Sequence, residues 1–276
     1  MHAGSDKSRD PAFGTMKGIR RVGMTIGLET YLLLTVTGLV AGFVDSIAGG
    51  GGLISLPVLL SVGLPPQVAL GTNKLQGSFG TLSAVVNYMS KGKTPFRDIR
   101  LGVPFTLLGA ATGAWAIQRL NPALLNRLIP ILLFAVLIYT FFAKTLGYEK
   151  RKALLPRGLF YLIFGTSLGF YDGFFGPGTG SFWTAALLLC LGLEMTQATG
   201  LTKVMNFTSN VVALAVFVLG GHVLYSAGLC MAAGQAFGAR IGSNLAIVNG
   251  ARFIRPFFLS IVFLTLARML YTTYLA

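Results

Sequence analysis

Residues 42–51 read GFVDSIAGGG, and residues 169–178 read GFYDGFFGPG. When the two stretches are aligned with Gly42 opposite Gly169, five of the ten positions are identical. The identities include an aspartate, Asp45 in the first stretch and Asp172 in the second. Acidic residues are rare in this chain, which has eight among 276 positions. A match that includes one of them therefore indicates an internal duplication.

A second pair of matching stretches follows these motifs. ALGTNK at residues 69–74 aligns with ATGLTK at residues 198–203, with three of six positions identical. A two-residue insertion in the second copy accounts for its longer spacing from the first motif. The match pairs Lys74 with Lys203, so each half of the chain carries one aspartate and one lysine at corresponding places.

The composition of the chain is that of a membrane protein. Hydrophobic residues make up 54% of the sequence and charged residues 11%, and the mean hydropathy is +0.72. An ordinary soluble domain has about 25% charged residues, and a single soluble core cannot bury so much apolar surface. These values argue against a soluble enzyme, a secreted disulfide scaffold and a disordered chain. The 36 glycines are typical of closely packed membrane helices.

The net charge of +14 does not indicate nucleic acid as a partner. Basic residues form short clusters between long apolar stretches, as at 91–100 and 149–152, which is the pattern of cytoplasmic loops in membrane proteins. Cys190 and Cys230 lie inside apolar segments, so no disulfide framework is expected. The chain has two histidines, and we expect neither a His-based metal site nor a bound cofactor.

Apolar runs long enough to cross a bilayer, which takes about 20 residues, predict an all-α bundle of membrane-spanning helices. The runs cover approximately 29–48, 75–90, 99–118, 125–146, 157–175, 201–221, 225–246 and 255–275. Two further runs, 53–63 and 181–192, are too short to span unaided, and each follows a glycine-rich break. Short or broken segments at corresponding places in two halves are the best sequence indication of a transporter's binding site.

We expect residues 1–27 to be an N-terminal leader or tail, with residues 1–15 foreign to the natural chain and Met16 as its start. Residues 28–150 and 151–276 would then form two homologous transmembrane repeats. If both short runs cross the membrane, the chain has ten segments and the repeats are inverted. All basic loops then lie on the cytoplasmic side, apart from the N-terminal basic cluster. If the short runs are re-entrant, there are eight segments and the repeats are parallel. We favour inverted repeats, each with a short broken or re-entrant helix.

The matched charges admit two interpretations. In the first, each repeat holds a structural ion pair, Asp45 with Lys74 in the first copy. The second copy would likewise pair Asp172 with Lys203. Alternatively, both lysines would extend to the membrane surface without pairing. In the second interpretation, all four surround a hydrated cavity, where the carboxylates exchange protons and the lysines attract an anion. Charges inside a membrane are costly and commonly functional, so we favour the cavity.

The glycine-rich breaks favour an anion site near the lysines. A chain that unwinds and restarts as a short helix has N–H groups without intrahelical partners at the new start, and the helix dipole there attracts an anion. Close helix packing is the alternative explanation for the glycines. The candidate substrate-binding residues are Gly49, Gly50, Gly51, Gly52, Thr72, Asn73, Lys74, Gln76, Gly176, Gly178, Thr179, Ser181, Lys203 and Asn206, with Asp45 and Asp172 as coupling or gating residues and Arg240 as a further candidate.

From about residue 28 to the end, the sequence resembles the sulfite exporter TauE/SafE family, also called the toluene-sulfonate uptake permease family. The resemblance rests on GFVDSIAGGGGLISLPVLLSVGLPPQVALGTNK and its weaker echo GFYDGFFGPGTGSFWTAALLLCLGLEMTQATGLTK. It implies a membrane transporter built from a duplicated unit and associated with sulfur-containing anions. Pro177 replaces a glycine and Thr202 replaces Asn73 in the second copy, so the two half-sites need not be equivalent.

We therefore expect a multi-pass secondary transporter of a bacterial inner membrane that moves small anions such as sulfite, thiosulfate, sulfoacetate or other organosulfonates. Its expected partners are the substrate, protons and the lipid bilayer, and an oligomer is compatible with the sequence. A passive anion channel and a cation-coupled transporter that uses Asp45 and Asp172 remain alternatives. An intramembrane enzyme would need a nucleophile–base pair or a ligand cluster, and the apolar segments show no such pair of histidines.

Overall fold

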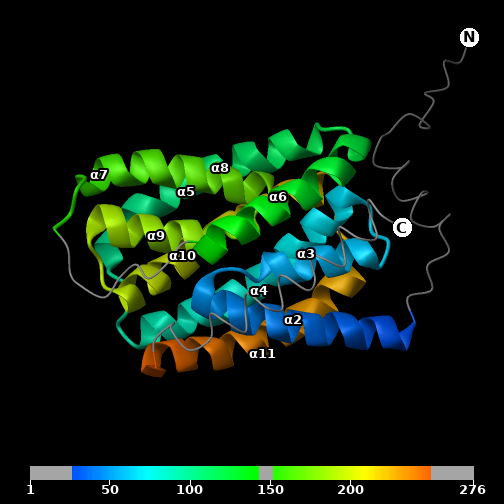
Figure 1. Cartoon of the computed structure of the whole chain (residues 1–276), viewed down its shortest axis with the longest axis horizontal. Helices are drawn as coiled ribbons and strands as arrows, with labels where there is room; N and C mark the ends of the chain where they lie inside the picture. The colour runs from blue at the N-terminus through cyan, green and yellow to red at the C-terminus, as the bar shows by residue number, and fades with distance from the viewer. Residues whose placement is uncertain (1–26, 143–151, 250–276) are drawn as a thin grey trace, which may run out of the picture.

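The computed structural model describes residues 27–142 and 152–249, and the regular structure in these residues is entirely helical (Figure 1). The helices are α2 (Leu28–Ala48), α3 (Gly52–Ser61), α4 (Pro66–Ser90), α5 (Phe96–Gln118), α6 (Pro122–Phe142), α7 (Arg157–Phe160), the π-helical η2 (Tyr161–Gly165), α8 (Thr166–Phe174), α9 (Thr179–Leu191), α10 (Met195–Leu219) and α11 (Tyr225–Asn249). The predicted all-helical fold is confirmed for this part of the chain. The predicted span at 255–275 and nearly all of the predicted leader lie outside the described residues.

The long helices have lengths that suit a bilayer. α2 and α6 have 21 residues, α5 has 23, and α4, α10 and α11 have 25 each. At about 1.5 Å per residue, 21 residues reach about 31 Å, close to the ~30 Å thickness of the hydrocarbon core. Among the described helices, α2 and α10 combine such a length with an 18-residue window of high mean hydropathy.

The two lysine-bearing helices are longer than the sequence predicts. The predicted spans begin at residues 75 and 201, whereas α4 begins at Pro66 and α10 at Met195. Lys74 and Lys203 are therefore each the ninth residue of a 25-residue helix, and the expectation that they stand at helix starts is wrong. The polar stretches before them remain helical because their side chains face the protein interior.

In the bundle, helices from one half of the chain pack against helices from the other half. Helices α2, α4 and α11 run in one direction along the long axis, and α5, α8 and α10 run in the other, so α2 and α8 are antiparallel (Figure 1). α2 packs most extensively against α11, and α8 packs most extensively against α5. The central helices α4 and α10 pack against each other, and also against α11 and α5 respectively. Each half therefore completes its packing with helices from the other half.

Glycines allow these exchanged helices to approach closely. In α5, a Cβ at Gly109 or Gly113 would collide with main-chain carbonyls of the segment that ends in α8. In α11, a Cβ at Gly238 or Gly242 would collide in the same way with carbonyls of α2. The alignment that pairs Lys74 with Lys203 also pairs these two sets of glycines. Close packing, the alternative explanation for the glycines, therefore holds at these crossings.

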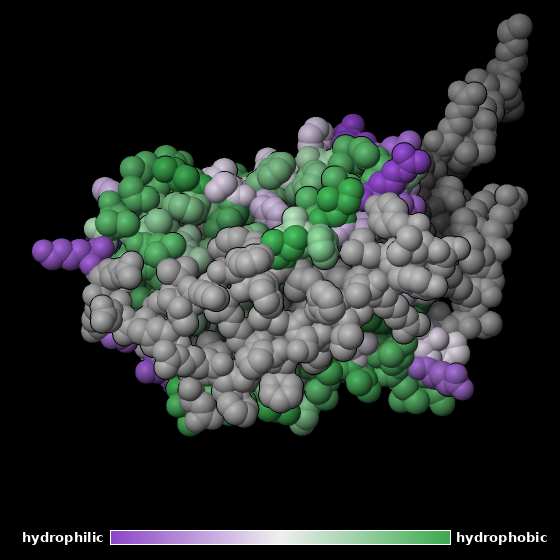
Figure 2. Space-filling model, in the orientation of Figure 1, coloured by the Kyte–Doolittle hydropathy of each residue, from purple (hydrophilic) through white to green (hydrophobic). Residues whose placement is uncertain are grey.

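The outer surface is apolar over most of its length. Large hydrophobic side chains are exposed on α2, α4, α5, α10 and α11. Figure 2 shows such side chains over the flanks of the molecule and hydrophilic ones gathered toward the two ends of the long axis. Such an extent of exposed apolar surface exceeds what a soluble monomer shows. It is the distribution expected where lipid covers the flanks and water covers the ends.

Two short helices follow the glycine-rich breaks, as the sequence predicts. α2 ends at Ala48, Gly49 has a φ of 78°, and α3 then runs for 10 residues. In the second half, α8 ends at Phe174, Gly176 and Gly178 have φ values of 100° and 82°, and α9 runs for 13 residues. Positive φ is readily adopted only by glycine, which explains why glycine stands at both breaks. A 10-residue helix reaches about 15 Å, or half of a bilayer.

The predicted span at 157–175 is a rod of three joined elements, α7, η2 and α8. Arg157 at its start binds the buried carboxylate of Asp98 at the start of α5, with Nη1 and Oδ2 2.8 Å apart. This pair joins the two halves at one end of the bundle. Sequence reasoning did not identify it, because Asp98 falls in a basic loop rather than in an apolar run.

The close contact of α2 with α11 predicts a large effect of Gly42→Ala. The added Cβ would collide with the main-chain carbonyl of Gln235, and overpacking of this kind costs about 1–3 kcal/mol. We expect a lower thermal-unfolding midpoint in detergent, measured by intrinsic fluorescence.

Gly158→Ala is the matched control, because nothing lies within 4 Å of a Cβ at this helical glycine. The control should unfold at the wild-type temperature. Equal stability of Gly42→Ala and the wild type would contradict the contact.

Candidate functional site

The two glycine-rich breaks lie against each other. A Cβ at Gly49 would overlap the Cα of Gly180, and a Cβ at Gly52 would lie 3.1 Å from the Cα of Pro177. The hydroxyl of Ser181 donates a hydrogen bond of 2.9 Å to the carbonyl oxygen of Ala48. Segments that are far apart in the sequence, one from each half of the chain, thus form one main-chain crossing.

Two ion pairs flank this crossing, and each joins one half of the chain to the other. Lys74 Nζ on α4 lies 2.6 Å from Asp172 Oδ1 on α8, and 2.5 Å from the main-chain oxygen of the same residue. Lys203 Nζ on α10 lies 3.4 Å from Asp45 Oδ2 on α2 and also donates to the Asp45 main-chain oxygen. Each lysine therefore caps the end of a broken helix and neutralises its aspartate.

The first interpretation predicts ion pairs inside each repeat, and its choice of partners is wrong. The structure pairs Lys74 with Asp172 instead of Asp45, and Lys203 with Asp45 instead of Asp172. The physical reason is the exchanged packing, which places each lysine-bearing helix beside the broken helix of the other half. The ion pairs exist, but they hold the halves together.

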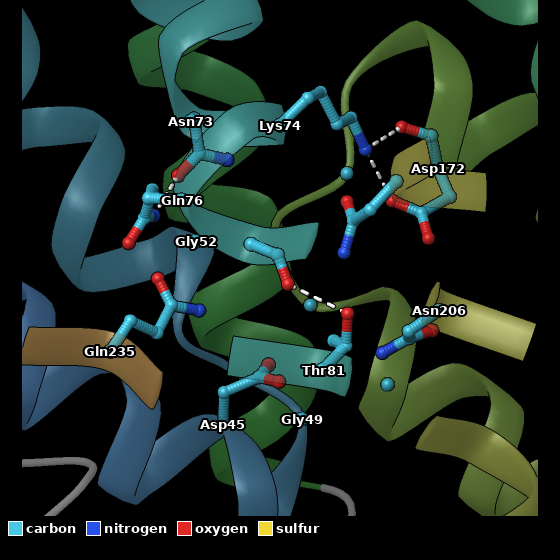
Figure 3. A pocket seen from close by; sticks show the side chains of 15 residues that line it. Asp45, Gly49, Gly52, Asn73, Lys74, Gln76, Thr81, Asp172, Asn206 and Gln235 are labelled. Carbon is cyan, nitrogen blue, oxygen red and sulfur yellow. Dashed lines mark hydrogen bonds and ion pairs between the residues drawn. The ribbon is translucent and has the colours of Figure 1, made fainter. Parts of the chain in front are cut away.

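A polar cavity opens between these elements (Figure 3). Its lining consists of carboxylates, a lysine, amides, a hydroxyl and glycines from both halves. These residues are Asp45, Gly49, Gly52, Asn73, Lys74, Gln76, Gly77, Thr81, Asp172, Gly176, Gly178, Gly180, Asn206, Asn210 and Gln235. The volume of about 30 Å³ exceeds the ~10–15 Å³ that one water molecule needs. In this conformation the cavity accommodates water or a small ion.

Three buried amide side chains in this lining have an oxygen without a hydrogen-bond partner. They are Gln76 on α4, Asn206 on α10 and Gln235 on α11. The Nε2 group of Gln76 is used, because it donates to Asn73 Oδ1 at 2.7 Å, and Asn73 also accepts from Ser55. Buried polar atoms are nearly always satisfied in folded proteins. Unsatisfied ones around a cavity therefore mark it as a place for water, ions or ligand.

The sequence comparisons agree with this geometry. Residues 34–269 match the family described as "Sulfite exporter TauE/SafE". The chain belongs to the TauE/SafE sulfite exporter family. It is 43% identical over 248 residues to a "Probable membrane transporter protein" of Haemophilus influenzae, covering 90% of this chain and 97% of the relative. Membership in this family makes the chain a membrane transporter.

Other relatives support the assignment. The "Probable membrane transporter protein YfcA" of Escherichia coli is 38% identical over 242 residues, covering 88% of this chain and 90% of that protein. The "Sulfite exporter TauE/SafE family protein 3" of Arabidopsis thaliana is 30% identical over 105 residues, covering 37% of this chain and 22% of that protein. No solved structure matches this TauE/SafE family chain.

The structure brings most of the predicted site residues to the cavity and places the others behind it. The residues that line it are Asp45, Gly49, Gly52, Asn73, Lys74, Gln76, Asp172, Gly176, Gly178 and Asn206. Behind the lining, Lys203 binds Asp45, and the hydroxyls of Thr179 and Ser181 bond to the main chain of the breaks. Thr72 accepts from the N–H of Leu224, and Gly50 and Gly51 lie outside the lining. Arg240 is exposed on α11, so its proposed place in the cavity wall is wrong.

Gly180, a glycine of the second break, also lines the cavity, and sequence reasoning missed four lining residues outside the breaks, Gly77, Thr81, Asn210 and Gln235. Gly77 and Thr81 follow Lys74 at helical spacing, and Asn210 follows Asn206 by four, so helical periodicity could have identified them. Gln235 is an isolated amide in an apolar run. Burying an amide without a hydrogen-bond partner is costly, so its presence there could have indicated a polar site.

The predicted free N–H groups at the starts of the short helices are largely occupied. In α3, the N–H groups of Leu53 and Ile54 donate to the carbonyls of Gly50 and Gly51 at 3.0 Å. The Gly51 N–H donates to Asp45 Oδ1 at 3.2 Å. Tight turns of this kind are common at helix ends. The N–H groups at the start of α3 are therefore less available to a ligand than the sequence predicts.

The crossed pairing predicts an order of stability among charge-removal variants. Removing one partner of a buried ion pair costs about 3–5 kcal/mol because a charge is left uncompensated. Lys74→Met should therefore destabilise the protein, and adding Asp172→Asn should restore part of the loss. Adding Asp45→Asn to Lys74→Met should not, because it disrupts the second pair as well.

Thermal unfolding of the purified variants in detergent gives this order. Pairs inside each repeat would produce the reverse order, with the Asp45→Asn combination more stable than the Asp172→Asn combination.

Proposed function

We propose that the chain is a proton-coupled secondary transporter of small, sulfur-containing anions, with its substrate site at the crossing of the two breaks. The observation that carries this proposal is the pair of buried lysines, each already neutralised by an aspartate of the other half. A site of this kind can exchange one negative charge for another without leaving net charge in the membrane interior.

The charge balance supports coupling to a proton. Two lysines and two aspartates sum to zero, so an added anion would leave one uncompensated negative charge in a low-dielectric interior. Such a charge is very costly unless it is paired. A proton on one carboxylate removes that charge, and the anion can then accept a hydrogen bond from Lys74 in the cavity lining. The anion and the proton are then expected to bind together, which is the thermodynamic basis of co-transport.

The small volume of the cavity supports a transport cycle with at least two conformations. The cavity accommodates water or a small ion, so a tetrahedral sulfur oxyanion requires the lining to widen. The crossing of Gly49 and Gly180 lies beside the cavity, and helices that meet there can separate only by moving as bodies. Alternating access in secondary transporters is largely of this rigid-body kind.

We further propose that the repeats are inverted and that the protein is multi-pass in a bacterial inner membrane. Opposite directions of α2 and α8 in Figure 1 support the inversion. The equivalent positions of the glycine pairs of α5 and α11 in the repeat alignment support it as well. Inverted repeats place their binding site near the bilayer midplane, where broken helices meet. Figure 2 shows an apolar flank that suits insertion.

The substrate class rests on the family. The family is described by sulfite export, and the Arabidopsis relative carries the same printed description. Sulfite, thiosulfate, sulfoacetate and other organosulfonates therefore form the first panel of substrates to test. Each is a compact anion whose oxygens can accept hydrogen bonds from lysine and amide groups.

Cation coupling is a second candidate, favoured by one specific observation. Gln76, Asn206 and Gln235 line the cavity together with Asp45, and each has a side-chain oxygen without a hydrogen-bond partner. Carboxylate and amide oxygens suit hard cations such as Na⁺. Uptake driven by a Na⁺ gradient at equal pH on both sides would favour this candidate over proton coupling.

Lys74→Ala should abolish most saturable anion uptake into proteoliposomes. A hydrogen bond to a charged group contributes about 1.5–3 kcal/mol, and about 1.4 kcal/mol corresponds to tenfold in binding. We expect uptake of radiolabelled thiosulfate at limiting concentration to fall by at least about tenfold.

Lys91→Ala is the control, because this lysine is exposed where α4 ends. Its uptake should equal that of the wild type. Both variants must elute as monodisperse protein. Wild-type rates in a folded Lys74→Ala variant would remove this lysine from the site.

A further inference from the structure

We propose that the two aspartates, which occupy equivalent positions in the duplicated motif, have different tasks. Asp45 carries the exchangeable proton, and Asp172 remains ionised as the permanent counter-ion of Lys74. The assignment deepens the proposed function and rests on its proton coupling. It follows from the different surroundings of the two carboxylates.

Asp172 is surrounded by hydrogen-bond donors. Its Oδ1 accepts from Lys74 Nζ at 2.6 Å, and its Oδ2 accepts from the hydroxyl of Ser209. The side chains of Lys74 and Asp172 are 2% and 5% exposed. Hydrogen bonds to a carboxylate favour its charged form. A proton on Asp172 would have to displace one of these donors.

Asp45 is held more loosely. Lys203 Nζ lies 3.4 Å from its Oδ2, and the Gly51 N–H reaches its Oδ1 at 3.2 Å. Its side chain is 14% exposed, nearly three times the value of Asp172. The nearby hydroxyl of Tyr88 donates to the Ser46 carbonyl. Each carboxylate has two donors, but those of Asp45 are farther away, so a proton arriving from the cavity competes with weaker hydrogen bonds there.

The sequence explains this difference between the two copies. The alignment that pairs the two lysines places Gly80 opposite Ser209, so the first copy lacks the hydroxyl that binds Asp172 in the second. A Cβ at Gly80 would lie 2.7 Å from Nε2 of Gln235 and still closer to its Cγ. The space of the missing side chain is thus filled by the Gln235 amide. The position equivalent to Gln235 is Thr106, which bonds to Met205 away from any carboxylate.

The cavity supplies acceptors for a proton on Asp45. A protonated carboxyl becomes a donor and needs an acceptor. Gln76, Asn206 and Gln235 line the same cavity, and each has a side-chain oxygen without a donor. Gln235 lies on α11, the helix against which α2 packs.

The charged and titratable groups near Asp45 come from three elements. Lys203 lies on α10, Lys74 and Tyr88 on α4, and Asp172 on α8, whereas α11 contributes the neutral Gln235. When Asp45 takes up a proton, Lys203 loses its ion pair, and an incoming anion can take the place of the carboxylate charge. Loss of the proton from Asp45 restores the Lys203 pair and expels the anion.

Infrared difference spectroscopy of the protein in lipid, recorded between about pH 5 and pH 8 with and without thiosulfate, tests the assignment. The wild type should show a carboxylic-acid C=O band that grows as the pH falls. The band should be lost in Asp45→Asn and kept in Asp172→Asn. Asp45→Glu should shift the band without removing it. A band that persists in Asp45→Asn, or the absence of any such band in the wild type, would overturn the proposal.

A charge-neutral variant guards against misfolding. Asp45→Asn leaves Lys203 without its ion pair, so Asp45→Asn/Lys203→Gln removes both charges of that pair together. The band should be absent from this variant as well, and its presence would contradict the assignment.

Transport measurements separate this proposal from the proposed function. Thiosulfate is a suitable probe because it does not titrate in this pH range. Asp45→Asn should retain thiosulfate exchange across proteoliposomes at equal concentrations and lose about tenfold or more of the accumulation driven by a pH gradient. If the wild type transports none of the anion panel, the proposed function fails. The infrared result still decides whether Asp45 is the carboxyl that binds a proton.

Discussion

The structure depends on two ion pairs in the interior of the bundle, in which Lys74, Asp172 and Lys203 are buried and Asp45 is partly exposed. A lone lysine or aspartate in a membrane interior is unfavourable by several kcal/mol, so each must have a partner of opposite charge. The exchanged packing of the helices decides which partner is available. Lys74 reaches Asp172 and Lys203 reaches Asp45 because α4 and α10 lie at the centre of the bundle, each beside the broken helix of the other half.

This arrangement makes the two halves interdependent. Neither half can neutralise its own charges by direct contact, because the aspartate of each half pairs with the lysine of the other half. The helix crossings follow the same rule, since the glycines of α5 face the α8 segment and those of α11 face α2. Packing and electrostatics therefore favour the same assembly, and both would be lost together if the halves were separated. A transport site at this boundary senses any relative movement of the halves.

Much of the fold was predictable from the sequence, and the reasons are physical. Hydropathy and low charge predict the helical membrane protein, and the motif around Asp45 and Asp172 predicts the duplication and the broken helices. The partners of the lysines were not predictable, because a repeat alignment relates equivalent positions and says nothing about which helices touch. The start of α4 was missed because Asn73 and its neighbours look like a loop unless their burial is known. Gln235 was missed because its role depends on the empty side-chain position at Gly80, in a distant part of the chain.

The contact of Gly49 with Gly180 determines how the passage can widen. Side chains that narrow a pore can rotate independently and give a graded range of widths. A junction of two polypeptide backbones has no rotamers, so its aperture changes only when entire helices are displaced. In the proposed transport cycle, opening at this junction is therefore all-or-none.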